Sequence, residues 1–425
     1  MSLFEELTWR GLVHQVTHGE LAGLLERERF TLYCGFDPTA DSLHVGSLLP
    51  ILGLVRFQRA GHRPIALVGG GTGMIGDPSF KADERKLLDR SQVEQNIGGI
   101  RAQLERFLDF SGAHAALLIN NADWLCKLTL VDFLRDIGKH FSVNQMIARD
   151  AVKQRLESRE HGISYTEFSY NLLQAYDFLH LCRSHGCRLQ VGGSDQWGNI
   201  VAGMDLTRRL ERVDTFGLTF PLVEKADGAK FGKTESGNVW LDAGRTSPYK
   251  FYQFWINQTD ADTPRWLRAF TFLSREEIES LETAVREKPE ERAAQRRLAE
   301  EVTRVVHGEA ALQSAVHASR AMFGGPLTGL DDATLEEIFS EMPSAELRRN
   351  VLTGDRLLVD VLVEAKVFKS KGEARRLIQS GGLYLNNERV AGEDVKMTAA
   401  ALCGERIAVV RTGKKNYHLL KFMDR

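Results

Sequence analysis

Polar side chains suited to phosphate binding follow a short apolar stretch near the start of the sequence. Within residues 33–50, YCGFDPTADSLHVGSLLP, we expect a strand to end and a helix to begin. His44 and Ser47 then share one face of the first helical turn, with Asp41 or Ser42 as the N-cap. The N-terminus of a helix can bind phosphate through its backbone amides. The segment favours a phosphate site, although a plain strand-turn-helix corner has the same pattern.

A second polar group lies on a predicted helix that begins at Ser164 and ends near Arg183. The spacing of Tyr170, Gln174 and Asp177 places them on one face of this helix, among Phe, Leu and Ala residues. A solvent-facing stripe is one interpretation. Because such stripes usually consist of Lys and Glu, we favour the wall of a pocket.

Two glycine-rich turns follow predicted strands. The first, GTGMIG at residues 71–76, matches the dinucleotide fingerprint, but a charged segment follows it instead of an apolar helix. We interpret it as a turn that lets the backbone approach a small ligand, with Asp77 available to pair with a cation. The second, GGSDQ at residues 192–196, offers Asp195 to a ribose hydroxyl and Gln196 to polar groups of a substrate. An ordinary strand-to-helix turn is the alternative.

A basic loop, KADGAKFGKT, occupies residues 225–234. It is not a Walker A motif, because Asp227 stands where that motif requires glycine. Lys230 and Lys233 would suit a pyrophosphate leaving group, whose negative charge grows in the transition state. A solvated basic turn is the alternative.

The elements that must position these groups alternate between strand and helix. Short apolar runs bounded by turn residues predict strands at 30–36, 63–70, 115–119 and 188–191, with helical periods between them. This order predicts a parallel sheet covered by helices, which binds ligands beyond the carboxyl ends of its strands. From Ser247 onward the pattern is helical.

The carboxyl-terminal residues differ from the rest in charge. The net charge is −2 overall, yet residues 353–425 contain 14 Lys/Arg and 9 Asp/Glu. Their pattern predicts helix, helix and strand, with a phosphate-contacting surface. Its basic residues are Lys371, Arg375, Arg376, Lys414 and Lys415.

Composition limits the classes of protein that are possible. The 425 residues are 43% hydrophobic and 26% charged, as in ordinary globular proteins, and predict more than one domain. No leader-like start and no span-length apolar run is present, so we expect a cytoplasmic protein without membrane association. The five cysteines have no metal-ligand spacing, and we expect no metal site.

In combination these motifs resemble those of bacterial tyrosyl-tRNA synthetase, a class I aminoacyl-tRNA synthetase, over essentially the whole chain. GFDPTADSLHVGS resembles the family's HIGH segment, and KFGKT resembles its KMSKS loop. FSYNLLQAYDF and QVGGSDQWGN resemble its tyrosine and ATP pocket motifs, and residues 353–425 resemble an S4-type RNA-binding domain. Ser47 replaces the second His of HIGH. Phe231, Gly232 and Thr234 replace the Met, the first Ser and the final Ser of KMSKS.

The resemblance implies a domain organisation and an assembly. We expect a Rossmann-like α/β catalytic domain at 1–245, an α-helical domain on the anticodon side of the tRNA at 246–325, a linker at 326–352 and a small α+β S4-like domain at 353–425. A homodimer is also implied. Its interface would include about residues 120–160, around Leu130 to Met146.

The resemblance also assigns roles to single residues. The substrate tyrosine is assigned to Tyr33 and Asp177 for its hydroxyl, and to Asp77, Tyr170, Gln174 and Gln196 around its ammonium group. ATP is assigned to Gly35, Asp37, Thr39, His44, Gly46, Ser47, Gly193 and Asp195, with Asp195 at the ribose. The loop that closes over pyrophosphate is assigned Lys230, Lys233 and Thr234.

The implied reaction has two steps. The tyrosine carboxylate attacks the α-phosphate of ATP, supplied with Mg2+, and the tyrosyl group then passes to the terminal ribose of tRNA(Tyr). No tightly bound cofactor is expected, and catalysis would come from orientation and charge stabilisation. Two alternatives stay open: a related synthetase for another aromatic amino acid, and an RNA-binding protein that has lost catalysis.

Overall fold

The computed structural model divides into two compact units. It describes residues 1–77, 88–148, 152–153, 156, 163–226, 228, 231–234, 237–353, 355–413 and 416–424. The first unit comprises residues 1–246 and 255–306, and the second comprises 247–254 and 307–425. The predicted four-part division of the chain remains a prediction.

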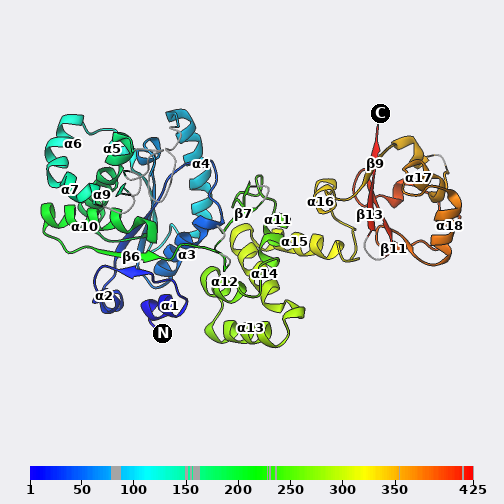
Figure 1. Cartoon of the computed structure of the whole chain (residues 1–425), viewed down its shortest axis with the longest axis horizontal. Helices are drawn as coiled ribbons and strands as arrows, with labels where there is room; N and C mark the ends of the chain where they lie inside the picture. Colours follow the sequence, from blue (N-terminus) through cyan, green and yellow to red (C-terminus); the bar gives the residue numbers. More distant parts are fainter. Residues whose placement is uncertain are drawn as a thin grey trace. The chain divides into compact units, whose positions relative to one another are not determined.

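A six-stranded sheet forms the centre of the first unit (Figure 1). Its strands, in order across the sheet, are β1 (Gln15–Val16), β6 (Phe216–Phe220), β5 (Cys187–Gly193), β2 (Thr31–Phe36), β3 (Arg63–Val68) and β4 (Leu117–Asn120). All neighbours pair in parallel except β1 with β6. Successive strands of such a sheet need helical crossovers, and the predicted α/β fold is confirmed.

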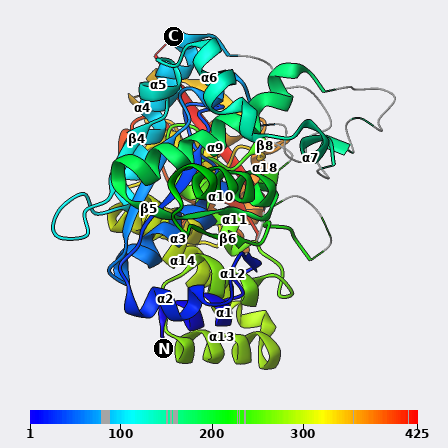
Figure 2. The same cartoon turned by 90° about the vertical axis from the view of Figure 1, so that its left-hand side faces the viewer.

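Helices surround this sheet and continue beyond it. Those of the first unit are α1 (Leu3–Trp9), α2 (Leu21–Arg27), α3 (Val45–Arg59), α4 (Arg90–Phe107), α5 (Ala122–Leu125), α6 (Leu130–Asp136), α7 (Val143–Ile147), α9 (Tyr165–His185), α10 (Trp197–Glu211), α12 (Thr263–Phe270), α13 (Arg275–Glu287) and α14 (Ala293–His307). Figure 2 shows α9 beside α10, where a Cβ at Gly203 would lie 3.0 Å from the Phe178 side chain. Chain order reverses between β2 and β5, and this switch point favours a ligand crevice at their carboxyl ends.

Two helices begin at residues that bear on the site. α9 begins as predicted, because the Ser164 hydroxyl accepts a hydrogen bond from the Glu167 amide. The predicted N-cap of α3 at Asp41 or Ser42 is wrong. His44 is the N-cap, while Asp41 pairs with Arg245 and the Ser42 hydroxyl donates to the Leu43 carbonyl.

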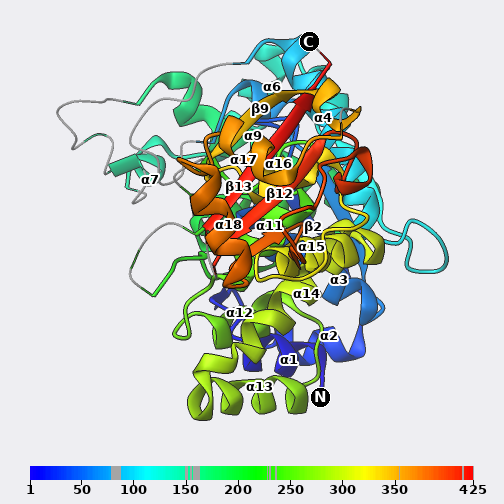
Figure 3. The same cartoon turned by 90° about the vertical axis from the view of Figure 1, so that its right-hand side faces the viewer.

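The second unit is built on a five-stranded sheet (Figure 3). Its order is β11 (Glu388–Arg389), β10 (Leu383–Leu385), β12 (Ile407–Thr412), β13 (Asn416–Met423) and β9 (Ser344–Arg348). The helices are α11 (Pro248–Ile256, mostly in this unit), α15 (Glu309–Ala321), α16 (Asp332–Ile338), α17 (Leu358–Glu364) and α18 (Lys371–Gln379). Residues 326–352, expected as a linker, contribute α16 and the edge strand β9.

In the part of the chain that the structure describes, no helix is both long and apolar enough to cross a bilayer.

Candidate active site

The deepest part of the candidate site surrounds Asp177 on α9. Its carboxylate accepts hydrogen bonds from Trp124 Nε1 at 2.8 Å and from Asn121 Nδ2 at 2.9 Å. Burial raises the pKa of Asp177 to about 8, even though both hydrogen bonds favour the ionised form. Tyr33, on β2, is also buried, and its hydroxyl has no hydrogen-bond partner among the described residues. Burial and then the charge of Asp177 raise the pKa of Tyr33.

A second network lies where β2 and β3 end. Asp37 accepts hydrogen bonds from the hydroxyl groups of Tyr170 and Thr72, each at 2.8 Å. Thr72 in turn accepts from Asn121 Nδ2 at 3.0 Å, which connects Asp37 with the Asp177 site. Burial and then the nearby Asp37 carboxylate raise the pKa of Tyr170, so the phenol is a hydrogen-bond donor at neutral pH. The sequence resemblance assigns Asp37 to ATP and Tyr170 to the ammonium group of the substrate tyrosine. In the structure these two side chains are hydrogen-bonded to each other.

A third network brings together the remaining residues assigned to the ammonium group. Gln196 Nε2 donates to Asp77 Oδ2 at 2.7 Å and to Asp195 Oδ2 at 3.1 Å. Gln174 Nε2 donates to Gln196 Oε1 at 3.2 Å. Carboxylates and amide oxygens therefore converge from the ends of β3 and β5 and from α9, which is a suitable environment for a cation.

Glycines keep space open beside these groups. Gly35 is exposed although its strand is central, and a Cβ added there would meet no atom within 4 Å. By contrast, a Cβ at Gly193 would lie 2.3 Å from Asp195 Oδ1, and one at Gly69 would lie 2.1 Å from Asp37 Oδ1. The glycines at 69 and 193 allow the carboxylates to approach the turns, while Gly35 leaves room for a ligand.

The predicted phosphate segment forms the start of α3. His44 Nδ1 accepts a hydrogen bond from the Gly46 amide at 3.0 Å. Because this amide can only donate, the neutral imidazole has its proton on Nε2. Ser47 lies in the same first turn, and Thr39 is exposed in the turn before it. His44, Ser47 and the helix amides can present donors to a phosphate.

The basic loop is described in part. Lys230 lies outside the described residues, and only the backbone of Lys233 and Thr234 is described, as β7 (Lys233–Thr234) paired with β8 (Gly237–Asn238). Phe231 lies between the two lysines in the sequence, and its ring centre is 4.7 Å from that of Trp266 and 5.5 Å from that of Phe270.

Three of the predicted RNA-contacting residues, Lys371, Arg375 and Arg376, are exposed on α18. Lys371 Nζ lies 2.8 Å from Asp360, and Arg375 Nε lies 3.2 Å from Glu393. Exposed pairs of this kind contribute little stability, so phosphates could replace the carboxylates. Lys414 and Lys415 lie outside the described residues.

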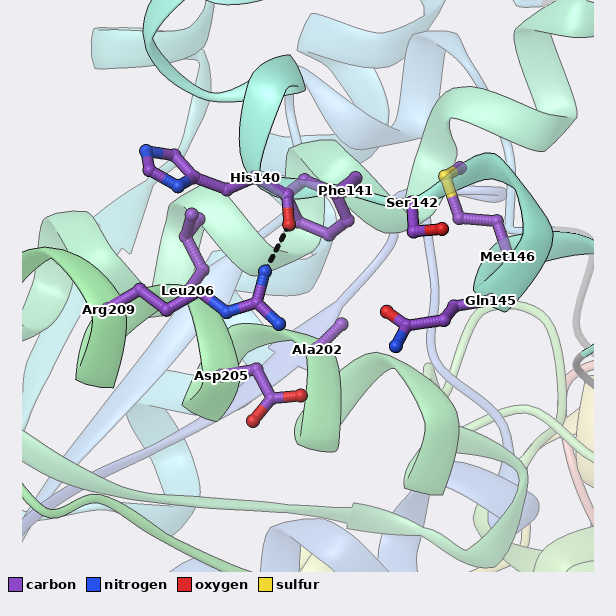
Figure 4. Close-up of a pocket in the computed structure, with 9 residues that line it drawn as sticks. All are labelled: His140, Phe141, Ser142, Gln145, Met146, Ala202, Asp205, Leu206 and Arg209. Atoms are coloured by element: carbon purple, nitrogen blue, oxygen red, sulfur yellow. Dashed lines mark hydrogen bonds between the residues drawn. The ribbon is translucent and has the colours of Figure 1, made fainter.

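A small pocket of about 30 Å³ lies away from these networks (Figure 4). It is lined by residues 140–142, by Gln145 and Met146, and by four residues of α10, of which Arg209 donates from a guanidinium nitrogen to the His140 carbonyl. It contains none of the assigned site residues and is too small for tyrosine or ATP. Among the described residues, no group of three or more His, Cys, Asp and Glu side chains could hold a metal ion.

Three site residues were not predicted from the sequence: Thr72, Asn121 and Trp124. The signal that could have identified Asn121 is its position directly after a strand, at the edge where ligands bind. Its contacts with Thr72 and Asp177 depend on the order of the strands, which the sequence pattern does not contain.

Comparison with known proteins identifies the family. The family model described as "tRNA synthetases class I (W and Y)" matches residues 25–324, and the model of the "Tyrosine–tRNA ligase SYY-like C-terminal domain" matches residues 334–420. Relatives named Tyrosine–tRNA ligase from Roseiflexus castenholzii and Geobacillus stearothermophilus are each 55% identical, over 99% of this chain and 100% of theirs.

Solved structures agree with this assignment. A C-terminally truncated mitochondrial tyrosyl-tRNA synthetase of Aspergillus nidulans has a TM-score of 0.68 and 32% identity, covering 76% of this chain and 94% of that chain. A tyrosyl-tRNA synthetase of Archaeoglobus fulgidus, at 17% identity, has a TM-score of 0.51 and covers 74% of this chain and 99% of its own, which shows a shared fold alone. The resemblance seen in the sequence is confirmed. The chain belongs to the class I aminoacyl-tRNA synthetases of the tryptophan and tyrosine group, and within that group to the tyrosine–tRNA ligases.

Proposed function

We propose that this protein joins L-tyrosine to tRNA(Tyr). ATP and tyrosine first form tyrosyl-adenylate and pyrophosphate, and the tyrosyl group then passes to the 3′-terminal ribose of the tRNA. Full-length relatives with this name support the overall reaction. The single observation that supports tyrosine as the amino acid is the buried pair of Tyr33 and Asp177.

Hydrogen bonding of this pair favours a substrate that carries a hydroxyl. The buried Tyr33 hydroxyl has no partner among the described residues, and a buried unsatisfied polar group costs about 1–3 kcal/mol. A substrate phenol between Tyr33 and Asp177 would give the Tyr33 hydroxyl a partner and would add one to the two that Asp177 already has. Phenylalanine would leave the cost in place, which argues against a synthetase for an amino acid without a hydroxyl.

The ammonium end of the substrate would meet the negative side of the site. Asp77, Gln174 and Gln196 are already hydrogen-bonded to one another, with Tyr170 on the neighbouring network. The cluster is therefore organised before a ligand arrives, which reduces the entropy lost on binding.

The remaining residues would orient ATP. The amides at the start of α3, with His44 and Ser47, would take the phosphates, and Asp195 would accept from a ribose hydroxyl. Gly35 and Gly193 would let the nucleotide approach the backbone, while Thr39 and the lysines of the loop would contact the leaving pyrophosphate. Mg2+ would enter with ATP as part of the substrate. No side chain needs to act as a nucleophile, since the tyrosine carboxylate is the attacking group.

ATP–pyrophosphate exchange with each amino acid tests this proposal. We expect exchange with tyrosine and none with phenylalanine or tryptophan, and we expect Asp177→Ala to abolish it. Asp214→Ala, an exposed carboxylate outside the site, is the control. Exchange with another aromatic amino acid would overturn the substrate assignment. Folded protein without any exchange would favour the RNA-binding alternative.

We also propose that two copies of the chain associate. Apolar side chains of α6 and α7 are exposed over the predicted interface: Leu130 (72%), Val131 (71%), Leu134 (44%), Val143 (56%) and Ile147 (41%). Five exposed large apolar side chains within residues 130–147 are unusual on a monomer surface. Val131→Asp should shift the sedimentation coefficient to that of a monomer, whereas Phe110→Asp, at another exposed apolar site, should not.

The tRNA would contact the basic face of α18. Arg375→Glu combined with Arg376→Glu should lower aminoacylation of tRNA and leave tyrosine-dependent exchange unchanged. Equal losses in both assays would argue that these residues support the fold instead of binding RNA.

A further inference from the structure

A short segment of the first unit, residues 239–246, runs antiparallel to the residues just before α3; we call it the strap. The Val45 amide donates to the Val239 carbonyl at 3.0 Å, and the Leu241 amide donates to the Leu43 carbonyl at 2.8 Å. Between these bonds, His44 and Trp240 form an antiparallel bridge. The strap therefore holds the backbone of the N-cap residue of α3 from outside the helix.

The Trp240 side chain contacts the imidazole itself. The ring centres of His44 and Trp240 are 6.2 Å apart, with an interplanar angle of 68°, which is an edge-to-face contact. Trp240 is itself held in place, because the Arg245 guanidinium lies 3.8 Å from the centre of its ring. Arg245 also pairs with Asp41 at 2.7 Å, so it connects the strap to the turn before α3.

These contacts restrict the imidazole in a way that the N-cap bond alone does not. The hydrogen bond from Gly46 to Nδ1 selects the tautomer, and by itself it leaves some rotation of the ring about the Cβ–Cγ bond. The edge-to-face contact with Trp240 limits this rotation. Together the two contacts restrict the direction in which the Nε2–H bond points.

The strap is also hydrogen-bonded to the basic loop. The Val239 amide donates to the Gly232 carbonyl at 3.0 Å. Gly232 has φ of +79°, and a Cβ there would lie 2.6 Å from Val45 Cγ2. The carboxyl-terminal part of the basic loop and the imidazole therefore both lie against the first turn of α3.

We propose that Trp240 is a positioning residue for His44, with Arg245 holding Trp240 in place. This inference rests on the proposed role of His44 at the ATP phosphates. A tryptophan that only filled a surface groove would support stability without acting through His44, and the two roles make different predictions.

A double-mutant cycle separates them, using the full chain and tyrosine-dependent exchange. Trp240→Leu should lower kcat about tenfold, because the imidazole of His44 would leave its best orientation. The KM for tyrosine should stay unchanged. Trp240→Phe should restore most of the rate, because it keeps an aromatic edge. In a His44→Ala background, Trp240→Leu should cost less than about twofold. Trp9→Leu is the matched control, since Trp9 is also half-buried and lies against arginines outside the site.

The outcomes distinguish this inference from the proposed role of His44. If His44→Ala keeps the wild-type rate, the proposed role fails and the inference with it. If His44→Ala is slow but Trp240→Leu lowers the rate equally in both backgrounds, only the inference fails. A wild-type kcat for Trp240→Leu would also overturn it. Thermal unfolding of each variant confirms that the compared proteins are folded.

Discussion

Replacing Asp177 by asparagine should change how the stability of the first unit depends on pH. Asp177 is buried and keeps a pKa of about 8, against an ordinary value of 3.8. Between these values the unfolded chain has released a proton that the folded chain retains. Wild-type stability therefore falls as the pH rises through this interval, and levels off above about pH 8. The Asp177→Asn variant has no titrating group at this position. Its unfolding free energy therefore lacks this part of the dependence on pH.

The magnitude follows from the linkage relation. One proton contributes about 1.36 kcal/mol for each pH unit, so the difference in unfolding free energy between variant and wild type should change by about 2.7 kcal/mol from pH 5.5 to pH 7.5. The amide can accept from only one of Asn121 and Trp124, which costs roughly 1–3 kcal/mol at every pH. Because this cost is the same at every pH, it shifts the plot of the difference in unfolding free energy against pH without changing the slope of that plot.

Chemical denaturation followed by tryptophan fluorescence measures this slope. All six tryptophans lie in the first unit, so the signal reports that unit. The variant should gain stability relative to wild type as the pH rises. Asp214→Asn controls for the loss of a carboxylate elsewhere. If the difference in unfolding free energy between the variant and wild type is constant between pH 5.5 and 7.5, the pKa of Asp177 is not raised. Desolvation by burial would then not be the largest influence on that pKa.

Three further predictions test other parts of the structure. Tyr33→Phe should lower kcat/KM for tyrosine in exchange by about tenfold at most, since it removes one hydrogen bond to the substrate; an unchanged value would contradict the proposed contact. Gly46→Ala should slow exchange with little change in the unfolding midpoint, because its Cβ would lie 2.7 Å from His44 Cε1 and displace the ring; wild-type kinetics would argue against a role for that ring. Arg56→Met should destabilise the first unit by roughly 1–3 kcal/mol in denaturation, because the buried guanidinium donates to the carbonyls of Ala269 and Thr271; no change would mean that other donors replace it.

The central elements were predictable because local signals agree there. β2, β3, β5, α3 and α9 correspond to apolar runs or helical periods bounded by strong turn residues. β6 was not predicted, although all five of its residues are buried. Its short run, FGLTF, lacks the alternation that marks a strand with one exposed face.

The site was predictable where residues lie at strand ends or on one helix face. Tyr170, Gln174 and Asp177 do belong to one polar region, as the helical spacing indicates. The N-cap of α3 was mispredicted because Asp41 and Ser42 are engaged by distant residues, Arg245 and Gln103. Contacts of this kind depend on the folded topology, so a local pattern cannot show them.

The position of β13 has a consequence for how the protein is made. This strand comes latest in the sequence, yet it lies inside the second sheet, between β12 and the edge strand β9. During synthesis, β9 leaves the ribosome well before the strand it must pair with. The second unit therefore cannot complete its sheet until residue 423 has been made and released from the ribosome, whereas the first unit needs nothing beyond residue 306. In a growing chain the first unit, which contains the proposed adenylate-forming site, should therefore fold before the sheet of the second unit is complete.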